Sequence, residues 1–419
     1  MSAAAAAATA SVNRAAEVLR LPEDALPFLR HDRAEELTLE PGSLTCEAGV
    51  ITGFDPDPAA ALQIDASGCA LLPGLVDCHT HLPFAGWRAG EYEMKVRGVS
   101  YEEIARQGGG IRASGRALAE SSDADVLDQA AALADEMLQH GTTAFECKSG
   151  YGLSRQAELR ALRLAESLGE RVVQRTVSTG LLAHAVPDGF TADAWMDEVE
   201  AMLPEVVAGT GAQALDVYVE SVAFSNEHLE RMGRLAAANG LDLRAHVEQF
   251  NANRSVPVAL EAGARSVDHL ARLVTEDVVP LARAECAAVL LPGAEFLGDE
   301  ALAPARALAD AGAICVLATD ANPGTSPVVS LPLVIGVAAR RYGWSVREAL
   351  LAVTLNAAWV LRMSDERGSL EPGKRADLVL LDGPADHVPY RFGHNPVACV
   401  VVGGELAYVR PDSAWRVRG

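Results

Sequence analysis

Basic residues are scarce in this sequence. Its 419 residues include 35 lysines and arginines against 57 aspartates and glutamates, which gives a formal net charge of −22. No run of basic residues could neutralise a phosphate backbone, so we expect no nucleic-acid partner. If the ligand of the protein is an anion, its positive contact must come from individual side chains at the site.

We also expect no cysteine framework, no membrane span and no secretory leader. The seven cysteines of the sequence are odd in number and form no CxxC pair, which argues against disulfides or a thiolate zinc site and indicates a reducing cytoplasm. No apolar run approaches the ~20 residues that span a bilayer, so we expect no membrane partner. We interpret the alanine-rich start, Met1–Ala10, as a disordered tail.

Short apolar runs instead alternate with longer helical patterns. The helical segments 155–169 and 226–240 close with glycine at a plausible C-cap, and a Ser345–Glu348 capping box opens a helix over 345–361. Eight strand and helix units predict an α/β fold with a (β/α)8 barrel. The candidate strands cover residues 71–81, 142–150, 172–184, 214–221, 243–250, 264–270, 287–293 and 314–324.

The two ends of the chain have a different pattern. Short extended runs broken by turn residues occupy residues 37–70 and return over residues 368–409. We expect these ends to pair into one small β-sandwich domain, with the barrel inserted between them. The expected divisions are 1–72 for the tail and first part of the β domain, 73–364 for the barrel and 365–419 for the rest of the β domain.

Histidines stand where several candidate strands end. His79 and His81 end the first strand, where alternate residues share a face, so both rings can reach one metal ion. An HxH pair alone is weak evidence, but His246 ends the fifth strand and Asp320 the eighth. All four therefore fall on the carboxyl rim of the barrel, where barrel enzymes place their sites.

Three imidazoles and one carboxylate suit Zn²⁺ or Fe better than Ca²⁺ or Mg²⁺. We expect one such ion per subunit, and a metal of this kind lowers the pKa of water toward about 7 and so supplies a nucleophile. Asp320 could also accept the proton of the water. His269 ends the sixth strand and could orient the nucleophile or polarise the scissile carbonyl, or it could be a structural histidine.

Longer motifs are more specific than HxH. The run PGLVDCHTHLPFAGWRAGEYEMKVRGVSYEEIARQGGGI is joined by ECKSGYGL, LLAHAVP, AHVEQF, VDHLAR and TDANPGTSP. Together these motifs resemble the imidazolonepropionase family of histidine degradation, within the metal-dependent amidohydrolases. The resemblance extends from about residue 72 to residue 361 and, through GSLEPGKRADLVLLD, nearly to the C-terminus.

The resemblance implies hydrolysis of the cyclic amide 4-imidazolone-5-propanoate to N-formimidoyl-L-glutamate by a homodimer. Catalysis would involve Asp320, His269 and His184, with His184 at the end of the third strand bonding the ring carbonyl as charge builds on it. The implied metal ligands are His79, His81, His246 and Asp320. The implied substrate contacts are Arg88, Tyr151, His184, Gln249, Asn322, Gly324 and Thr325.

These contacts suit the substrate chemically. Arg88 can hold a propionate with two parallel bonds, and Tyr151 lies in a glycine-flanked loop that could close over a ring. The amide of Gln249 can donate and accept. Free backbone N–H groups around Gly324 and Thr325 could contact product carboxylates.

Two other hypotheses for the function stay open. Another hydrolase or deaminase of the superfamily, acting on a small carboxylate-bearing cyclic amide or amidine, would share the metal ligands, and a non-catalytic barrel would share only the fold. Arg88 and Tyr151 favour a carboxylate-bearing ring, and the complete ligand set argues against a non-catalytic protein. The segment NANRSVPVALEAG after Gln249 lacks the Gly-Gly pair typical of the family, and Glu220 is the acidic residue to consider for a second metal.

Overall fold

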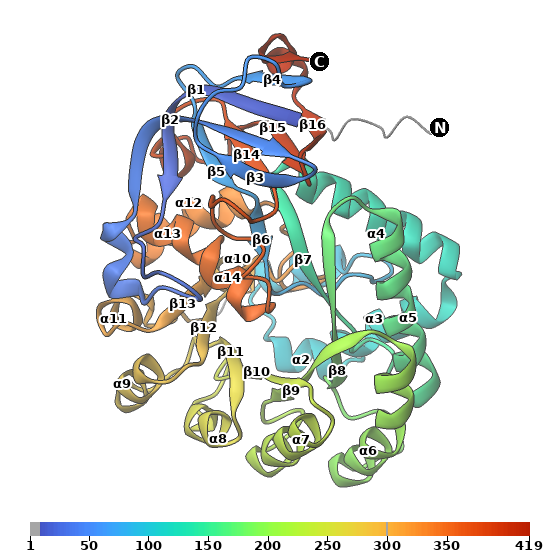
Figure 1. Cartoon of the computed structure of the whole chain (residues 1–419). Helices are drawn as coiled ribbons and strands as arrows, with labels where there is room; N and C mark the ends of the chain where they lie inside the picture. Colours follow the sequence, from blue (N-terminus) through green and yellow to red (C-terminus); the bar gives the residue numbers. More distant parts are fainter. Residues whose placement is uncertain (1–8, 299–300) are drawn as a thin grey trace.

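The computed structural model describes residues 9–298 and 301–419, and within these ranges the central feature is an eight-stranded parallel sheet curled into a barrel (Figure 1). The prediction of a (β/α)8 barrel is confirmed. All eight predicted segments contribute a strand, and the strands follow one another around the barrel in chain order. They are β6 (Leu75–Asp77), β7 (Thr142–Lys148), β8 (Arg175–Ala183), β9 (Ala212–Val219), β10 (Asp242–Val247), β11 (Ala264–His269), β12 (Ala287–Leu290) and β13 (Ile314–Leu317).

The first and last strands meet just beyond their carboxyl ends. A parallel bridge joins Thr80 to Ala321, the N–H of Asp320 donates to the carbonyl of His79 (3.0 Å), and the N–H of His81 donates to the carbonyl of Ala321 (2.9 Å). The barrel is therefore closed by backbone bonds between the segments that carry three of the four expected metal ligands. The seam that closes the barrel therefore also brings His79, His81 and Asp320 together.

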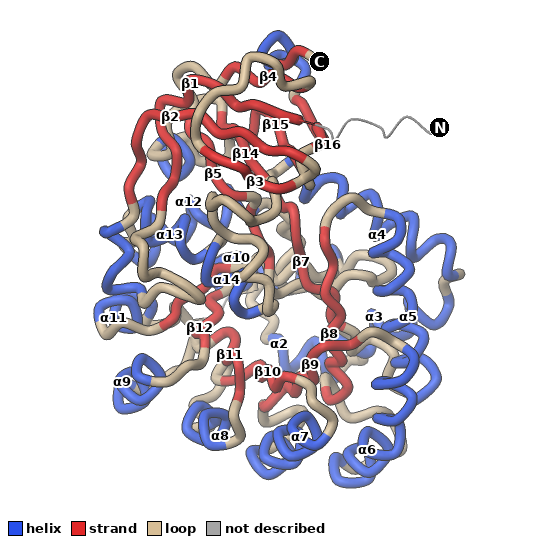
Figure 2. The backbone as a smooth tube through the Cα atoms, in the orientation of Figure 1, coloured by secondary structure: helices blue, strands red, loops and turns tan. Residues whose placement is uncertain are grey.

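Helices surround the barrel on its outer side (Figures 1 and 2). The inner faces of most of these helices carry leucine, valine, methionine and alanine at helical spacing, and these side chains pack against the outward-facing strand residues. The helices are α1 (Ala89–Val96), α2 (Tyr101–Arg106), α3 (Ile111–Glu120), α4 (Asp123–Gln139), α5 (Arg155–Arg171), α6 (Ala192–Gly209), α7 (Asn226–Ala238), α8 (Ser255–Glu261), α9 (Thr275–Arg283), α10 (Pro292–Leu297), α11 (Ala305–Asp310), α12 (Leu331–Tyr342), α13 (Val346–Ala352) and α14 (Leu355–Val360). None of the helices in the described ranges is both long and apolar enough to cross a membrane.

The two chain ends share a second sheet, as expected, which has nine strands among the described residues. N-terminal β5 pairs antiparallel with C-terminal β14, and Figure 1 shows the blue and red strands side by side. The sheet encloses its own apolar core. Its strands are β1 (Thr9–Arg20), β2 (Thr38–Glu47), β3 (Val50–Gly53), β4 (Leu62–Asp65), β5 (Ala70–Pro73), β14 (Leu378–Leu381), β15 (Val397–Val402), β16 (Glu405–Val409) and β17 (Val417–Arg418); α15 (His387–Tyr390) and the 3-10 helices His31–Glu36 and Pro411–Arg416 complete the chain.

Local expectations were wrong at several places. Residues 1–8 of the expected disordered tail lie outside the described residues, but Thr9 and Ala10 begin β1, which buries Ala10 against the β-domain core. The predicted first strand is two strands in different sheets, divided at Gly74, where a Cβ atom would lie 2.0 Å from Oγ1 of Thr143.

Two helix expectations also need correction. Helix α5 continues past Gly169 to Arg171, so Gly169 is not a C-cap. The predicted helix over 345–361 is two helices, because Thr354 between them has non-helical backbone angles (φ −125°, ψ −100°). The Ser345–Glu348 capping box and the C-terminal Gly240 with positive φ are confirmed.

His31 is a buried histidine without a charged partner. Its side chain is 1% exposed, neither ring nitrogen has a hydrogen-bond partner among the described residues, and its ring packs against Trp344 at a centroid distance of 4.3 Å. Burial, and to a smaller extent the charge of Arg306, lowers the pKa of His31 to about 3. The ring is therefore neutral in the folded protein near pH 7.

We predict that His31 contributes to acid destabilisation. The unfolded chain takes up a proton below pH 6.5 while the folded chain does so only near pH 3, so stability is lost as the pH falls through this window. Between pH 6.5 and 5 the loss should be about 1.5 kcal/mol. Urea unfolding at pH 6.5 and pH 5 measures the loss of unfolding free energy in the wild-type protein and in two variants. The loss should be smaller than in wild type for His31→Phe, which keeps the ring packing. It should equal the wild-type loss for the control His387→Gln. Equal losses in all three proteins would contradict the prediction.

Candidate metal centre and active site

The expected ligands converge at the carboxyl rim of the barrel. His79 and His81 follow β6, His246 lies in β10 and Asp320 follows β13; all are 3% exposed or less. The backbone here is bent away from ordinary strand geometry. Asp320 and His269 have φ values of +54° and +79°, which non-glycine residues adopt only where the surrounding structure holds them.

The donor atoms of these residues fit a metal ion. Ligand atoms of His79, His81 and Asp320 lie within 4.8 Å of one another, as do those of His79, His246 and His269. Nε2 of His81 is 3.2 Å and Nε2 of His79 is 3.5 Å from Oδ1 of Asp320. Nε2 of His79 and of His246 is buried with no hydrogen-bond partner among the described residues. Buried nitrogen lone pairs around one carboxylate are the donor set of a divalent transition metal.

Two buried carboxylates fix the orientation of these rings. Nδ1 of His79 donates to Asp268 (2.6 Å) and Nδ1 of His246 donates to Asp216 (3.1 Å). Since each carboxylate is an acceptor, the proton of each ring is on Nδ1 and the lone pair is on Nε2. Carboxylates that orient histidine ligands in this way are common around protein metal sites.

A network of five charged side chains lies beneath the rim, and its members are almost completely buried. Nζ of Lys148 lies 2.6 Å from Asp216 and 3.0 Å from Glu146. The guanidinium of Arg244 contacts Glu146 and lies 3.3 Å from Asp268. Two cations therefore face three carboxylates in the barrel interior, where unpaired charges would be very costly.

The network shifts the pKa values of Lys148, Asp216 and the neighbouring His79. Burial and Arg244 lower the pKa of Lys148, but the three carboxylates outweigh them and raise it above its usual value. Burial disfavours ionised Asp216, yet His246 and Lys148 hold the pKa of this carboxyl well below its ordinary value. Burial and then Lys148 lower the pKa of His79 well below its usual value, so this ring is neutral and able to bind metal.

Sequence reasoning missed this network, although the sequence contains a signal for it. Charged residues occupy alternate positions of apolar strands, at Glu146 and Lys148 in β7 and at Arg244 and His246 in β10. Alternate residues face the same side of a sheet. Ionic residues at this spacing in otherwise apolar strands point into the barrel.

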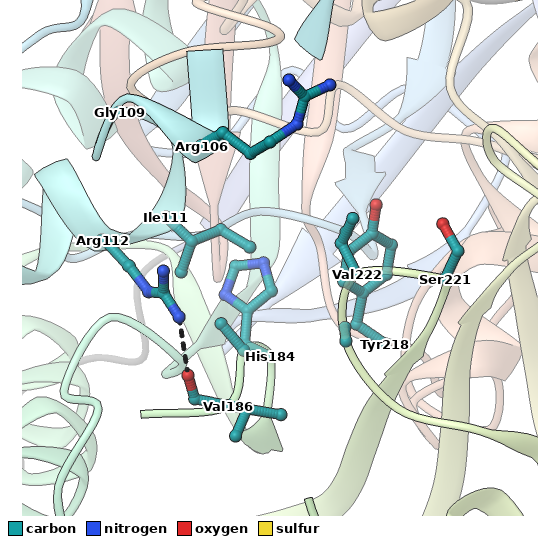
Figure 3. A pocket seen from close by; sticks show the side chains of 11 residues that line it. Arg106, Gly109, Ile111, Arg112, His184, Val186, Tyr218, Ser221 and Val222 are labelled. Atoms are coloured by element: carbon teal, nitrogen blue, oxygen red, sulfur yellow. Dashed lines mark hydrogen bonds between the residues drawn. The ribbon is translucent and has the colours of Figure 1, made fainter. Parts of the chain in front are cut away.

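The expected substrate residues lie close to the ligands. An inner cavity is bounded by twelve described residues, among them six of the seven expected contacts and His81, His246, His269 and Asp320. The exception is Gly324, which lies beneath Arg88. An outer cavity of about 410 Å³ opens beside it and shares Ile111, His184 and Tyr218 with it (Figure 3). Arg106 and Arg112 are among the residues that line the outer cavity.

Arg88 is held at the inner cavity by short-range contacts. Its Nη1 donates to Oγ of Ser114 (2.8 Å), and its Nε lies 3.1 Å from Glu91. The guanidinium lies directly over Gly324, where an added Cβ atom would be 1.8 Å from Nη2. Gly324 is therefore required for the position of Arg88.

The turn after Asp320 differs from the expectation. The N–H groups of Gly324 (2.8 Å) and Thr325 (2.7 Å) donate to Oδ1 of Asn322, so the expectation that they are free to contact product carboxylates is wrong. The Nδ2 group of Asn322 donates to the carbonyl of Asp320 (2.7 Å). An Asn that bonds the backbone two and three residues ahead fixes its own turn.

Two further residues make hydrogen bonds that the sequence did not predict. Nδ1 of His184 donates to the carbonyl of Gly150 (3.1 Å), which places its lone pair on Nε2. Both carboxylate oxygens of Glu220 accept hydrogen bonds from the loop after β10, and Glu220 belongs to none of the metal-binding groups found among the described residues. Glu220 is therefore not placed as a ligand of a second metal.

Known proteins are similar to this chain in sequence over most of its length. A model of the amidohydrolase family matches residues 70–407. An imidazolonepropionase of Rubrobacter xylanophilus is 42% identical over 401 residues, covering 92% of this chain and 95% of the relative. One of Geobacillus kaustophilus is 38% identical, covering 94% and 97%.

Solved structures share the fold at much lower identity. E. coli guanine deaminase superposes with a TM-score of 0.71 at 16% identity, covering 96% of this chain and 99% of the other. An adenosine deaminase from Xanthomonas campestris with bound zinc superposes with a TM-score of 0.67 at 18% identity, covering 96% and 93%. These likenesses support the barrel and its attached sheet.

We predict that Lys148→Met strongly destabilises the protein. The substitution removes the cation that contacts Glu146 and Asp216 and leaves buried carboxylates uncompensated. The free energy of unfolding should fall by about 3–5 kcal/mol. Urea unfolding of the variant and of the exposed control Arg163→Met measures the difference, and a Lys148→Met protein as stable as the control would refute the role of the network.

Proposed function

The chain belongs to the imidazolonepropionases of the amidohydrolase family, and from this we infer that it hydrolyses 4-imidazolone-5-propanoate to N-formimidoyl-L-glutamate in histidine degradation. The observation that carries the inference is 38–42% identity to curated imidazolonepropionases over more than nine-tenths of the chain. The convergence of a metal cluster and an arginine on one cavity supports it, because the substrate is a ring that carries a carboxylate.

We propose that His79, His81, His246 and Asp320 hold one zinc or iron ion per subunit. When bound, the metal would lower the pKa of a water molecule and polarise the ring carbonyl. His269 is within reach of the same cluster and is proposed to orient the reacting groups. Buried free cysteines support a reducing cytoplasm as the compartment, and the family resemblance supports a homodimer.

Arg88 is proposed to bind the propionate. Its contacts with Ser114 and Glu91 use Nη1 and Nε and leave other guanidinium donors for the substrate. The ring would then lie between Tyr151, Gln249 and the metal cluster. Local positive charge of this kind is what a protein with a net charge of −22 needs to bind an anion.

His184 is proposed to accept a hydrogen bond from a ring N–H of the substrate. Its Nδ1 proton is directed at the carbonyl of Gly150, so Nε2 is an acceptor in the neutral ring. Burial lowers the pKa of His184 well below its usual value, which opposes the protonated form that could donate to a carbonyl. This differs from the donor role expected from the sequence.

Asp320 is proposed to move the proton. Burial raises the pKa of Asp320 above its ordinary value although His269 and His246 oppose this, and its Oδ1 lies 3.2 Å from Nε2 of His81, at the cluster where the water would be activated. Asp320 would take the proton of the attacking water and deliver it to the leaving ring nitrogen as the C–N bond breaks. His269 is the alternative donor to this nitrogen.

The first experiment is the hydrolysis of freshly generated 4-imidazolone-5-propanoate, followed by loss of its ultraviolet absorbance, with metal content measured on the same sample. We expect turnover that is lost on chelation and in Asp320→Asn. A metal-loaded enzyme that leaves this substrate intact but hydrolyses or deaminates another small cyclic amide or amidine would overturn the assignment. An Asp320→Asn enzyme with full activity would exclude the proton-transfer role.

A second prediction concerns the arginine site. Gly324→Ala should displace the guanidinium of Arg88 and raise KM by about tenfold or more, which corresponds to about 1.4 kcal/mol. Gly90→Ala is the matched control, because a Cβ atom at Gly90 meets nothing within 4 Å. Steady-state kinetics on both variants measures the effect, and an unchanged KM in Gly324→Ala would show that Arg88 does not bind the propionate.

A further inference from the structure

Two glutamates beside the active site bind loop backbone with their carboxylates. Glu158 lies in the first turn of α5 and is 1% exposed, and Glu220 follows β9 and is 3% exposed. Neither residue belongs to a metal-binding group among the described residues. Each carboxylate accepts hydrogen bonds from the loop that carries an expected substrate contact.

Glu158 holds the loop between β7 and α5. Its Oε1 accepts from the N–H groups of Gly152 (2.7 Å) and Leu153 (3.0 Å), and its Oε2 accepts from that of Gly150 (2.9 Å). Tyr151 lies between two of these bonded residues. One buried carboxyl group therefore satisfies three backbone N–H groups and fixes the loop backbone on both sides of the tyrosine.

The same loop also fixes His184. The carbonyl of Gly150 accepts the Nδ1 proton of His184, while the N–H of Gly150 donates to Glu158. There is no room for a side chain here, since a Cβ atom at Gly150 would lie 2.7 Å from Nδ1 of His184 and one at Gly152 would lie 2.3 Å from the backbone nitrogen of Glu158. Through this loop, Glu158 therefore helps to fix two cavity residues, Tyr151 and His184.

Glu220 holds the loop after β10 in the same manner. Its Oε1 accepts from the N–H groups of Phe250 (2.8 Å) and Asn251 (3.1 Å), and its Oε2 accepts from Nδ2 of Asn251 (2.7 Å). Gln249 immediately precedes these residues and lines the inner cavity. This is the loop that lacks the Gly-Gly pair.

We propose that Glu158 and Glu220 are positioning residues for substrate binding: Glu158 places Tyr151 and His184, and Glu220 places Gln249. The proposal rests on the proposed function for the identity of the substrate. Glutamine substitutions test it, because an amide has one acceptor oxygen and would direct its NH₂ group at backbone N–H donors. The volume of the side chain is almost unchanged.

Glu158→Gln should raise KM for 4-imidazolone-5-propanoate by about tenfold while kcat stays within about threefold, because the loop binds substrate and the proton-transfer residues lie elsewhere. Amide hydrogen exchange in the metal-loaded protein should become faster in peptides covering 149–153. Glu220→Gln should raise KM similarly but accelerate exchange only over 249–252. Each variant is thus the matched control for the loop of the other, and exposed Glu166→Gln should change neither quantity.

Unchanged KM and unchanged exchange in both glutamine variants would overturn the proposal. A glutamine variant in which kcat, metal content and thermal midpoint all fall together would also overturn it, because this outcome indicates a general structural role. If a glutamine variant does not fold, Glu158→Asp and Glu220→Asp, which keep the charge on a shorter side chain, must show the same loop-specific pattern. Amide hydrogen exchange is measured independently of turnover. Wild-type protein that is inactive on this substrate would refute the proposed function. Faster exchange confined to the expected loop in each glutamine variant would still support the placement of the loops by the two glutamates.

Discussion

The site depends on the buried ion pairs that Lys148 and Arg244 make with three carboxylates inside the barrel. An uncompensated charge on Lys148 or Arg244 would be very costly in this interior, and each cation lies within 3.3 Å of two of the three carboxylates. Asp216 and Asp268 accept the Nδ1 protons of His246 and His79, which directs the Nε2 lone pairs toward the proposed metal position. The ionic interior of the barrel thereby determines the chemistry at its rim.

Barrel closure adds the remaining constraint. The seam between the ends of β6 and β13 brings His79, His81 and Asp320 together through backbone hydrogen bonds, and Asn322 fixes the turn that follows. The charged network fixes ring orientation, and the seam fixes ring position. Around them, carboxylates hold the loops, so anionic groups have structural as well as chemical roles in this acidic protein.

Sequence patterns predicted the barrel, its eight strand segments and the pairing of the chain ends, because periodicity and strand-end chemistry are local. They failed where long-range packing decides. The expected tail includes Thr9 and Ala10, which begin β1, and this strand packs in an apolar core drawn from both ends of the chain, with residues such as Leu71 and Leu378. Gly74, at the division between β5 and β6, packs against Thr143, which is distant in the sequence. The helix break at Thr354 is not marked by a nearby glycine or proline.

Because HxH, KSGYGL and TDANPGTSP are contiguous motifs, the amino-acid sequence alone indicates the family and the candidate metal and substrate residues. How those residues are held depends on the folded barrel. Residues separated by tens to hundreds of positions, such as His79 and Asp268 or Glu220 and Asn251, become hydrogen-bonded partners only when the barrel closes. Hydrogen bonds and buried ion pairs act over a few ångströms, and spacing along the chain contains no information about such distances.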